Sequence, residues 1–135
     1  MRYLCLIHFD PGALDALRER EVSELNARHL DLNERLLQSG HFIEAEALQR
    51  PASATCVRVR DGKTQVTDGP FAETKEMLGG FYLVEARDLN EAIRVAARIP
   101  SAAFGTVEVV PCRDLEVDGV PRKASRKSLE PSFNP

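Results

Sequence analysis

Residues 3–9 read Tyr3-Leu4-Cys5-Leu6-Ile7-His8-Phe9, a nearly continuous run of apolar and aromatic side chains. A strand with one face in water alternates polar and apolar residues, because successive side chains point to opposite faces of the sheet. This run does not alternate, so we expect a central strand that is covered on both faces. The dipeptide Pro11-Gly12 ends it.

A helical period replaces the strand pattern between residues 14 and 37. The positions that share one helix face are Leu14, Leu25, His29, Leu32 and Leu36. Gly40 follows as a stop signal, because glycine readily adopts the left-handed conformation that ends helices. We expect one long helix with a break near Arg20, and His29 at the centre of its apolar stripe, directed toward the sheet.

Two alternating runs, Thr55–Arg60 and Lys63–Asp68, flank the dipeptide Asp61-Gly62. Asp-Gly between alternating runs is a strong hairpin signal, and a two-residue loop makes pairing proceed outward until Thr55 faces Asp68. Because side chains two apart share a face, Asp68 lies with three valines on the face that we expect to be buried. Those valines are Val57, Val59 and Val66.

The remaining core elements complete an alternating order. Residues 41–48, 81–87 and 105–110 read as strands, and Asp88 caps a helix that Pro100 ends. Two helices alternating with a mainly antiparallel sheet predict an α+β ferredoxin-like sandwich with an inserted β-hairpin. Its helices cover one face of the sheet only. A second copy of the sheet would cover the other face, which predicts a homodimer of the α+β barrel type.

Composition and charge limit the classes of function. Charged residues make up 29% of the chain, the formal net charge is −3 and the pI is about 5.6, which gives no electrostatic footprint for nucleic acid. No apolar run is long enough to cross a membrane, so we expect no membrane association. The three cysteines form no CxxC pair, so no metal site is predicted and a reducing cytoplasm is the simplest compartment.

The composition changes after Cys112. Residues 122–127 are mostly basic and the last residues are rich in Pro and Ser. We therefore predict a core domain over residues 1–112 and a tail over residues 113–135 that lies outside it. Residues from about Val117 onward should be dispensable for folding.

The segment Asp68-Gly69-Pro70-Phe71-Ala72-Glu73-Thr74-Lys75-Glu76, followed by Gly79-Gly80-Phe81-Tyr82, resembles the DGPF signature of the YCII-related family. The opening strand, residues 85–92 and residues 105–109 are also similar to that family. The resemblance covers roughly residues 1–112. It implies a dimeric ferredoxin-like α+β barrel, a cleft between helix and sheet, and no obligatory cofactor.

The family resemblance also bears on chemistry. In the YCII branch a His–Asp pair is thought to act in catalysis, with the His in the first helix and the Asp before a Pro late in the chain. His29 matches the first of these, while the chain has Ile99-Pro100 at the second, so that Asp is absent. Some DGPF proteins are associated with extracytoplasmic-function (ECF) sigma factors, which implies an alternative regulatory role.

His29 and Asp68 are the candidate catalytic residues. An imidazole with a pKa near neutrality is a natural general acid or base, and an inward carboxylate must be hydrogen-bonded or shifted in pKa. The alternatives are a hydrogen-bonded histidine at the edge of the core and an aspartate that caps the Gly69-Pro70 turn. We expect both groups to line one cleft, within one subunit or across the dimer.

Further candidates for ligand binding are Phe71, Glu73, Lys75 and Tyr82 in the DGPF segment, although the charged members also fit a solvated turn with local ion pairs. Three functional hypotheses remain open at this point. The first is a dimer that binds a small polar organic molecule, with His/Asp acid–base chemistry. The second is a non-catalytic accessory module that works with a sigma factor. The third is a purely structural dimer domain.

Overall fold

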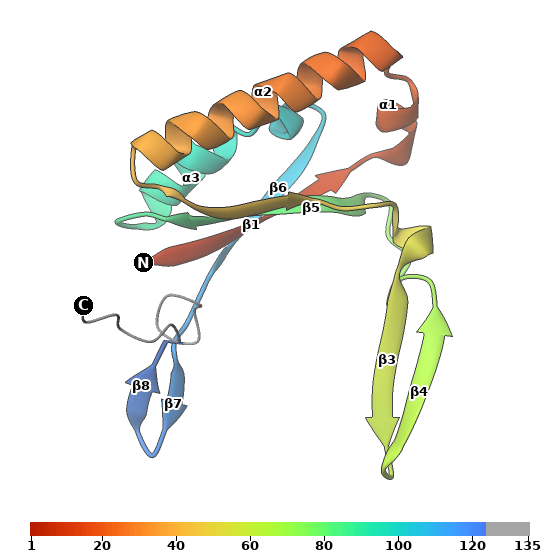
Figure 1. Ribbon diagram of the computed structural model, residues 1–135, viewed down its shortest axis with the longest axis vertical. Helices are drawn as coiled ribbons and strands as arrows, with labels where there is room; N and C mark the ends of the chain where they lie inside the picture. Colours follow the sequence, from red (N-terminus) through yellow and green to blue (C-terminus); the bar gives the residue numbers. More distant parts are fainter. Residues whose placement is uncertain (124–135) are drawn as a thin grey trace, which may run out of the picture.

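The computed structural model describes residues 1–123. Its centre is a four-stranded antiparallel sheet with the strand order β2-β5-β1-β6 (Figure 1). The strands are β1 (Arg2–Phe9), β2 (Phe42–Ala47), β5 (Met77–Glu85) and β6 (Gly105–Pro111). The apolar run that includes residues 3–9 therefore forms an inner strand, as predicted, and the order is consistent with a ferredoxin-like α+β fold.

Three helices connect these strands: α1 (Pro11–Asp15), α2 (Glu19–Gln38) and α3 (Leu89–Ala97). The long helix predicted from residue 14 is thus divided in two, with the break close to the expected position. The Asp88 carboxylate caps α3 by accepting from the backbone N–H of Glu91. Two short 3₁₀ turns, η1 (Pro51–Ser53) and η2 (Pro100–Ala103), follow β2 and α3.

The core lies between the helices and one face of the sheet. Tyr3, Cys5 and Ile7 of β1 are buried there against Leu32 and Leu36 of α2, together with residues of β5 and α3. Alternation places Leu4 and Leu6 on the other face, where they are only half-buried. The helices lie on one side of the sheet in Figure 1. The second face of β1 is therefore apolar but uncovered in the single chain.

The hairpin of β3 (Thr55–Arg60) and β4 (Lys63–Asp68) forms a separate two-stranded sheet. Its register is the predicted one, from Arg60 opposite Lys63 at the loop to Thr55 opposite Asp68. Figure 1 shows the hairpin projecting away from the sheet and helices. The expectation of a buried inner face is wrong within one chain, because the exposures of its three valines are 60–63%. No element of the described chain reaches across to cover them.

Residues beyond β6 contain a second small hairpin, β7 (Leu115–Val117) with β8 (Val120–Arg122). Its strands are exposed and form their own sheet, apart from the four-stranded one (Figure 1). An ion pair of 3.3 Å between the Arg2 guanidinium and the Asp114 carboxylate joins β1 to the segment that precedes this hairpin. Residues 124–135, which hold most of the predicted tail, lie outside the described residues.

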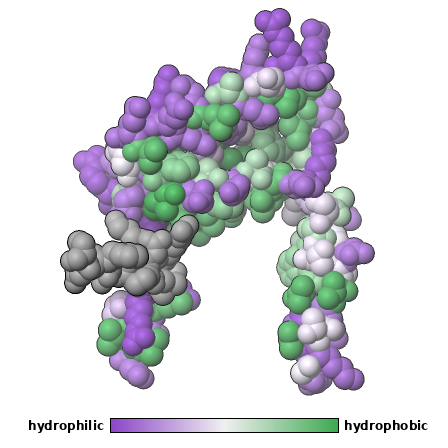
Figure 2. Space-filling view, in the orientation of Figure 1, coloured by the Kyte–Doolittle hydropathy of each residue, from purple (hydrophilic) through white to green (hydrophobic). Residues whose placement is uncertain are grey.

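Within residues 1–123, no helix is long and apolar enough to span a bilayer. Hydrophilic residues cover the outer surface of α2, and hydrophobic residues gather beneath that helix and along the β3–β4 hairpin (Figure 2). The apolar side of α2 thus faces the sheet.

Candidate functional site

A cavity of about 540 Å³ lies between α2 and the sheet, and we call it the α2 cavity. Most of its wall is apolar and comes from β1, α1, α2, β2 and β5. Among the apolar lining residues are Ile7, Phe9, Leu14, Val22, Leu25 and Phe81. The polar lining residues are Asn26, His29, Asn33, Glu46, Tyr82 and Ser101. An apolar cleft with a few convergent polar groups is the usual form of a small-molecule site.

His29 sits at the wall of this cavity with both ring nitrogens engaged. Its Nδ1 lies 3.1 Å from the Tyr82 hydroxyl, and its Nε2 lies 2.7 Å from the Ser101 hydroxyl. The Tyr82 hydroxyl also lies 3.5 Å from the backbone oxygen of His29. The imidazole belongs to α2 and is hydrogen-bonded to residues of β5 and η2, and these contacts limit the ring to one orientation.

Burial disfavours charge on the two titratable groups of this cluster. It lowers the pKa of His29 below its ordinary 6.5, and the nearby positive charge of Arg28 lowers that pKa further. Burial also raises the pKa of Tyr82 to about 12. At neutral pH the imidazole is therefore uncharged and the phenol keeps its proton. Both groups can then form hydrogen bonds without carrying a charge.

Ser101 was not among the residues that the sequence singled out. It lies in η2, directly after the Pro100 that ends the α3 region, and its side chain is fully buried. No periodicity marks a residue in such a turn. The available signal was its place beside Ile99-Pro100, where the family pattern has the catalytic Asp, and the hydroxyl of Ser101 is the group that reaches His29.

Asn33 lies one helical turn beyond His29 on α2 and also lines the cavity. Its Oδ1 is buried and, within residues 1–123, has no hydrogen-bond partner. A buried acceptor without a donor lowers stability, so such groups in native proteins often belong to sites that complete their bonding with a ligand or a water.

The structure does not bring Asp68 to His29 within one chain. Asp68 is exposed at the end of β4, on the hairpin that projects away from α2 (Figure 1). It lines neither cavity of the described chain, and its carboxylate makes no hydrogen bond with residues 1–123. Of the six sequence candidates, His29 and Tyr82 are therefore the pair that meets.

A second, more open cavity of about 1190 Å³ lies at the base of the β3–β4 hairpin, and we call it the loop cavity. It is lined by Phe71 and Glu73 from the DGPF segment, by His8 and by η1. The Phe71 ring is 79% exposed, with the Arg58 guanidinium carbon 5.7 Å from its centroid. Lys75 is exposed and lines neither cavity.

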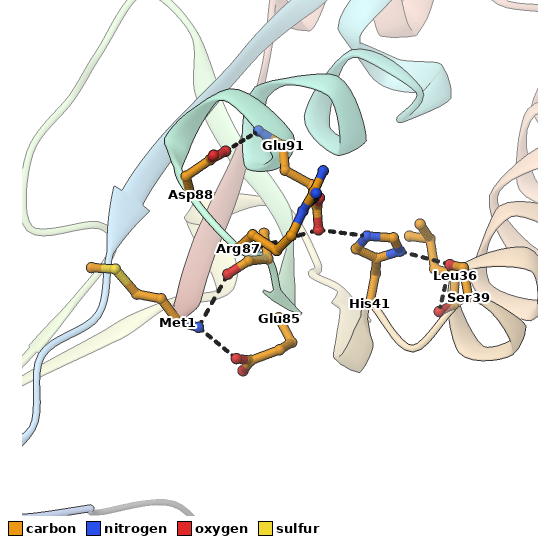
Figure 3. A network of polar contacts seen from close by, with 9 residues as sticks. Met1, Leu36, Ser39, His41, Glu85, Arg87, Asp88 and Glu91 are labelled. Atoms are coloured by element: carbon orange, nitrogen blue, oxygen red, sulfur yellow. Dashed lines mark hydrogen bonds and ion pairs between the residues drawn. The ribbon is translucent and has the colours of Figure 1, made fainter.

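Another polar cluster joins the start of β2 to α3 (Figure 3). His41 Nε2 lies 3.0 Å from a Glu91 carboxylate oxygen, and the other oxygen of Glu91 lies 2.5 Å from Arg87 Nε. The hydrogen bond from Arg87 is the main reason why the pKa of Glu91 falls to about 2. The Ser39 hydroxyl oxygen lies 2.7 Å from the other ring nitrogen of His41, Nδ1. This cluster lines neither cavity, and its charges satisfy one another, as in a structural ion-pair network.

Within the described part of the chain, no group of three or more His, Cys, Asp or Glu side chains is arranged to hold a metal ion. The polar groups that line the α2 cavity are hydroxyls, side-chain amides, one imidazole and the carboxylate of Glu46. Such groups suit hydrogen bonding and proton exchange rather than coordination.

Comparison with known proteins agrees with this architecture. The model of the YCII-related domain matches residues 1–116, which include the four-stranded sheet and all three helices. An uncharacterized protein of Rhizobium meliloti (strain 1021) is 32% identical over 113 residues, covering 82% of this chain and 91% of the relative. Both matches span most of the chain, and the chain therefore belongs to the YCII-related family.

Proposed function

We propose that this protein binds a small polar organic molecule in the α2 cavity and acts on it by acid–base chemistry that runs through His29. The observation that carries the proposal is the placement of one neutral imidazole, bonded to Tyr82 and Ser101, at the wall of a largely apolar cavity of about 540 Å³. An uncharged imidazole can take up a proton, and its two bonded hydroxyls can relay one.

The proposal places the protein in the DGPF-signature branch of its family. Its support is the continuous segment from Asp68 to Tyr82, which begins at the end of the β3–β4 hairpin and ends in the α2 cavity. The signature thus spans both cavities: Phe71 and Glu73 line the loop cavity, and Tyr82 lines the other.

A cytoplasmic homodimer is part of the same proposal. Leu4, Leu6 and Leu83 lie on the sheet face away from the helices and are half-buried in the single chain. A second copy that packs on this face would remove that apolar area from water, which is the main driving force for association. The three cysteines are free, which fits a reducing compartment.

A thermal-shift screen of uncharged and charged small organic compounds tests the binding, because a ligand of the native state raises the melting temperature. Ala47 and Ala72 offer a matched pair of control positions: both are exposed, but Ala47 lines the α2 cavity and Ala72 the loop cavity. A ligand of the α2 cavity should stabilise the wild type and Ala72→Phe, but not Ala47→Phe.

Two results would overturn the proposal. If no compound stabilises the wild type, the accessory role with a sigma factor becomes the leading hypothesis, and co-purification with that factor is its test. If Ala72→Phe rather than Ala47→Phe abolishes the shift, the binding site is the loop cavity and His29 is a packed core histidine.

A further inference from the structure

The hydroxyls of Tyr82 and Ser101 share one imidazole, and counting protons fixes the direction of their hydrogen bonds. A neutral imidazole has one N–H and one lone pair, so one of the two hydroxyls must donate to the ring and the other must accept from it. The hydroxyl that accepts keeps its own proton, which needs an acceptor elsewhere. The cluster therefore has one O–H to spare.

The acceptors within reach decide which hydroxyl keeps the spare proton. Ser101 is completely buried, and within residues 1–123 its hydroxyl contacts no acceptor other than His29. A spare proton on Ser101 would be a buried donor without a partner, which is costly. Both hydroxyls line the α2 cavity, but the Tyr82 hydroxyl has a further acceptor in the described chain, the His29 carbonyl oxygen at a long 3.5 Å. Ser101 thus donates to Nε2, and the Nδ1–H donates to Tyr82.

The charges around the cavity restrict its ligand. The described lining residues include no Lys or Arg, and the one carboxylate among them belongs to Glu46. A carboxylate or phosphate that entered this apolar space would leave water without gaining a cation, and an unpaired charge in such surroundings is strongly disfavoured. The raised pKa of Tyr82 likewise keeps the phenol a neutral donor.

We propose that the Tyr82 hydroxyl is the ligand-facing donor of the α2 cavity, and that the ligand is a molecule without negative charge, with an apolar body whose carbonyl oxygen accepts from it. His29 and Ser101 act as positioning residues that hold the phenol at the cavity wall, where a ligand oxygen replaces the His29 carbonyl oxygen, a long contact at 3.5 Å, as the acceptor of the phenol's hydrogen bond. The inference rests on the proposed binding function and adds the chemical class of the ligand to it.

Three probes that share a naphthalene ring separate the contribution of the carbonyl hydrogen bond from that of charge. Acetonaphthone has a carbonyl oxygen, ethylnaphthalene has none, and naphthoate carries a negative charge. Binding is measured by calorimetry, and the NMR shift of the isotope-labelled ketone carbon reports a hydrogen bond by moving downfield. The ketone should bind about tenfold more tightly than the hydrocarbon, the effect of one added hydrogen bond. Naphthoate should bind more weakly than either.

The chain supplies a matched control, because its two tyrosines are both buried on the same face of the sheet. Tyr82→Phe should abolish the ketone's advantage and its downfield shift while it leaves hydrocarbon binding unchanged. Tyr3→Phe removes a hydroxyl that bonds Met1 outside the cavity and should change neither. Nitrogen NMR of the wild type should show His29 as the Nδ1–H tautomer, a readout that does not depend on any variant.

An Nε2–H tautomer, or a ketone shift that persists in Tyr82→Phe, would overturn the inference. Equal binding of naphthoate and the ketone would overturn the exclusion of anions. In each of these cases the cavity still binds a ligand, so the proposed function survives. No binding by any of the three probes would overturn the inference alone, because the thermal-shift screen of small organic compounds is the test of the proposed function.

Discussion

The imidazole Nε2 of His29 and the hydroxyl oxygen of Ser101 lie 2.7 Å apart, although 72 positions of sequence separate the two residues. The contact joins α2 to the turn after α3 across the buried side of the sheet. Because this contact depends on how α2 and α3 pack against β1 and β5, the NMR signals of His29 report on that packing.

The titration of His29 should reflect its burial. We expect a pKa below 6.5 by NMR, because burial disfavours the imidazolium and Arg28 repels it. Arg28→Gln should raise that pKa, whereas Arg35→Gln, which alters an exposed Arg35–Asp31 ion pair on the same helix, should not. Because the folded pKa is lowered, the unfolded state binds the proton first, so the free energy of unfolding should fall as pH drops below 6.5. A pKa at or above 6.5 would contradict the buried, neutral placement.

Glu91 should contribute to acid stability in a defined pH range. Its folded pKa of about 2 lies below the usual 4.5, so the unfolded state takes up the proton first as pH falls. The stabilisation is complete above about pH 4.5 and is lost progressively toward pH 2. Urea unfolding should therefore show wild type more stable than Glu91→Gln near neutrality, with a difference that shrinks over this range. A constant difference would show that Glu91 acts through packing alone.

Gly105 should tolerate no side chain. A Cβ at this position would lie 2.1 Å from the backbone oxygen of His8, where β6 pairs with β1. Gly105→Ala should lower the free energy of unfolding by about 1–3 kcal/mol, the range for overpacked sites. Gly12→Ala is the matched control in α1, where the nearest atom is a side-chain oxygen at 3.4 Å, and it should cause no loss. Equal stability of the two variants in urea unfolding would contradict the close strand approach.

The uncovered sheet face should mediate the dimer. Sedimentation equilibrium at micromolar concentration should give twice the 15.0 kDa chain mass. Leu6→Arg places a charge on that face and should give the monomer, whereas Leu37→Arg changes an α2 residue that is 65% exposed and should leave the dimer intact. A wild-type monomer, or a dimer unaffected by Leu6→Arg, would show that this face is not the interface.

The position of Asp68 can then be tested in the dimer. Because Asp68 is remote from α2 within one chain, Asp68→Asn should leave the His29 titration of a monomeric Leu6→Arg variant unchanged. In the dimer, a lower His29 pKa in Asp68→Asn than in the wild type would mean that the hairpin of one subunit reaches the partner's α2 cavity. An unchanged titration in both forms would remove Asp68 from the candidate site.

Local patterns in the sequence were reliable where local geometry decides the outcome. Asp61 and Gly62 adopt positive φ angles of 51° and 73°, and the register that follows from such a loop was predicted pair by pair. Asp118-Gly119 carries the same signal, with φ of 53° and 75°, and closes the β7–β8 hairpin, which was not predicted within the segment assigned to the tail.

Long-range placement could not be derived in the same way. The helical stripe correctly directed His29 toward the sheet, because one face of α2 has to cover the core. The direction of the β3–β4 hairpin depends on contacts far along the chain, so its apolar face was wrongly expected to be buried. Ser101 meets His29 only through the packing of α3 and η2, and nothing in its own neighbourhood predicts that contact.

The central position of β1 has a consequence for synthesis. This strand pairs with β5 on one side and β6 on the other, so both of its neighbours are translated long after it. The apolar run at residues 3–9 must therefore remain without β5 until residue 85 has left the ribosome, and without its full set of partners until residue 111 has done so. Until then it is exposed to chaperones or to the same run on another nascent chain. Ribosome profiling of chaperone contacts along this message should show early and prolonged engagement that ends once β6 emerges.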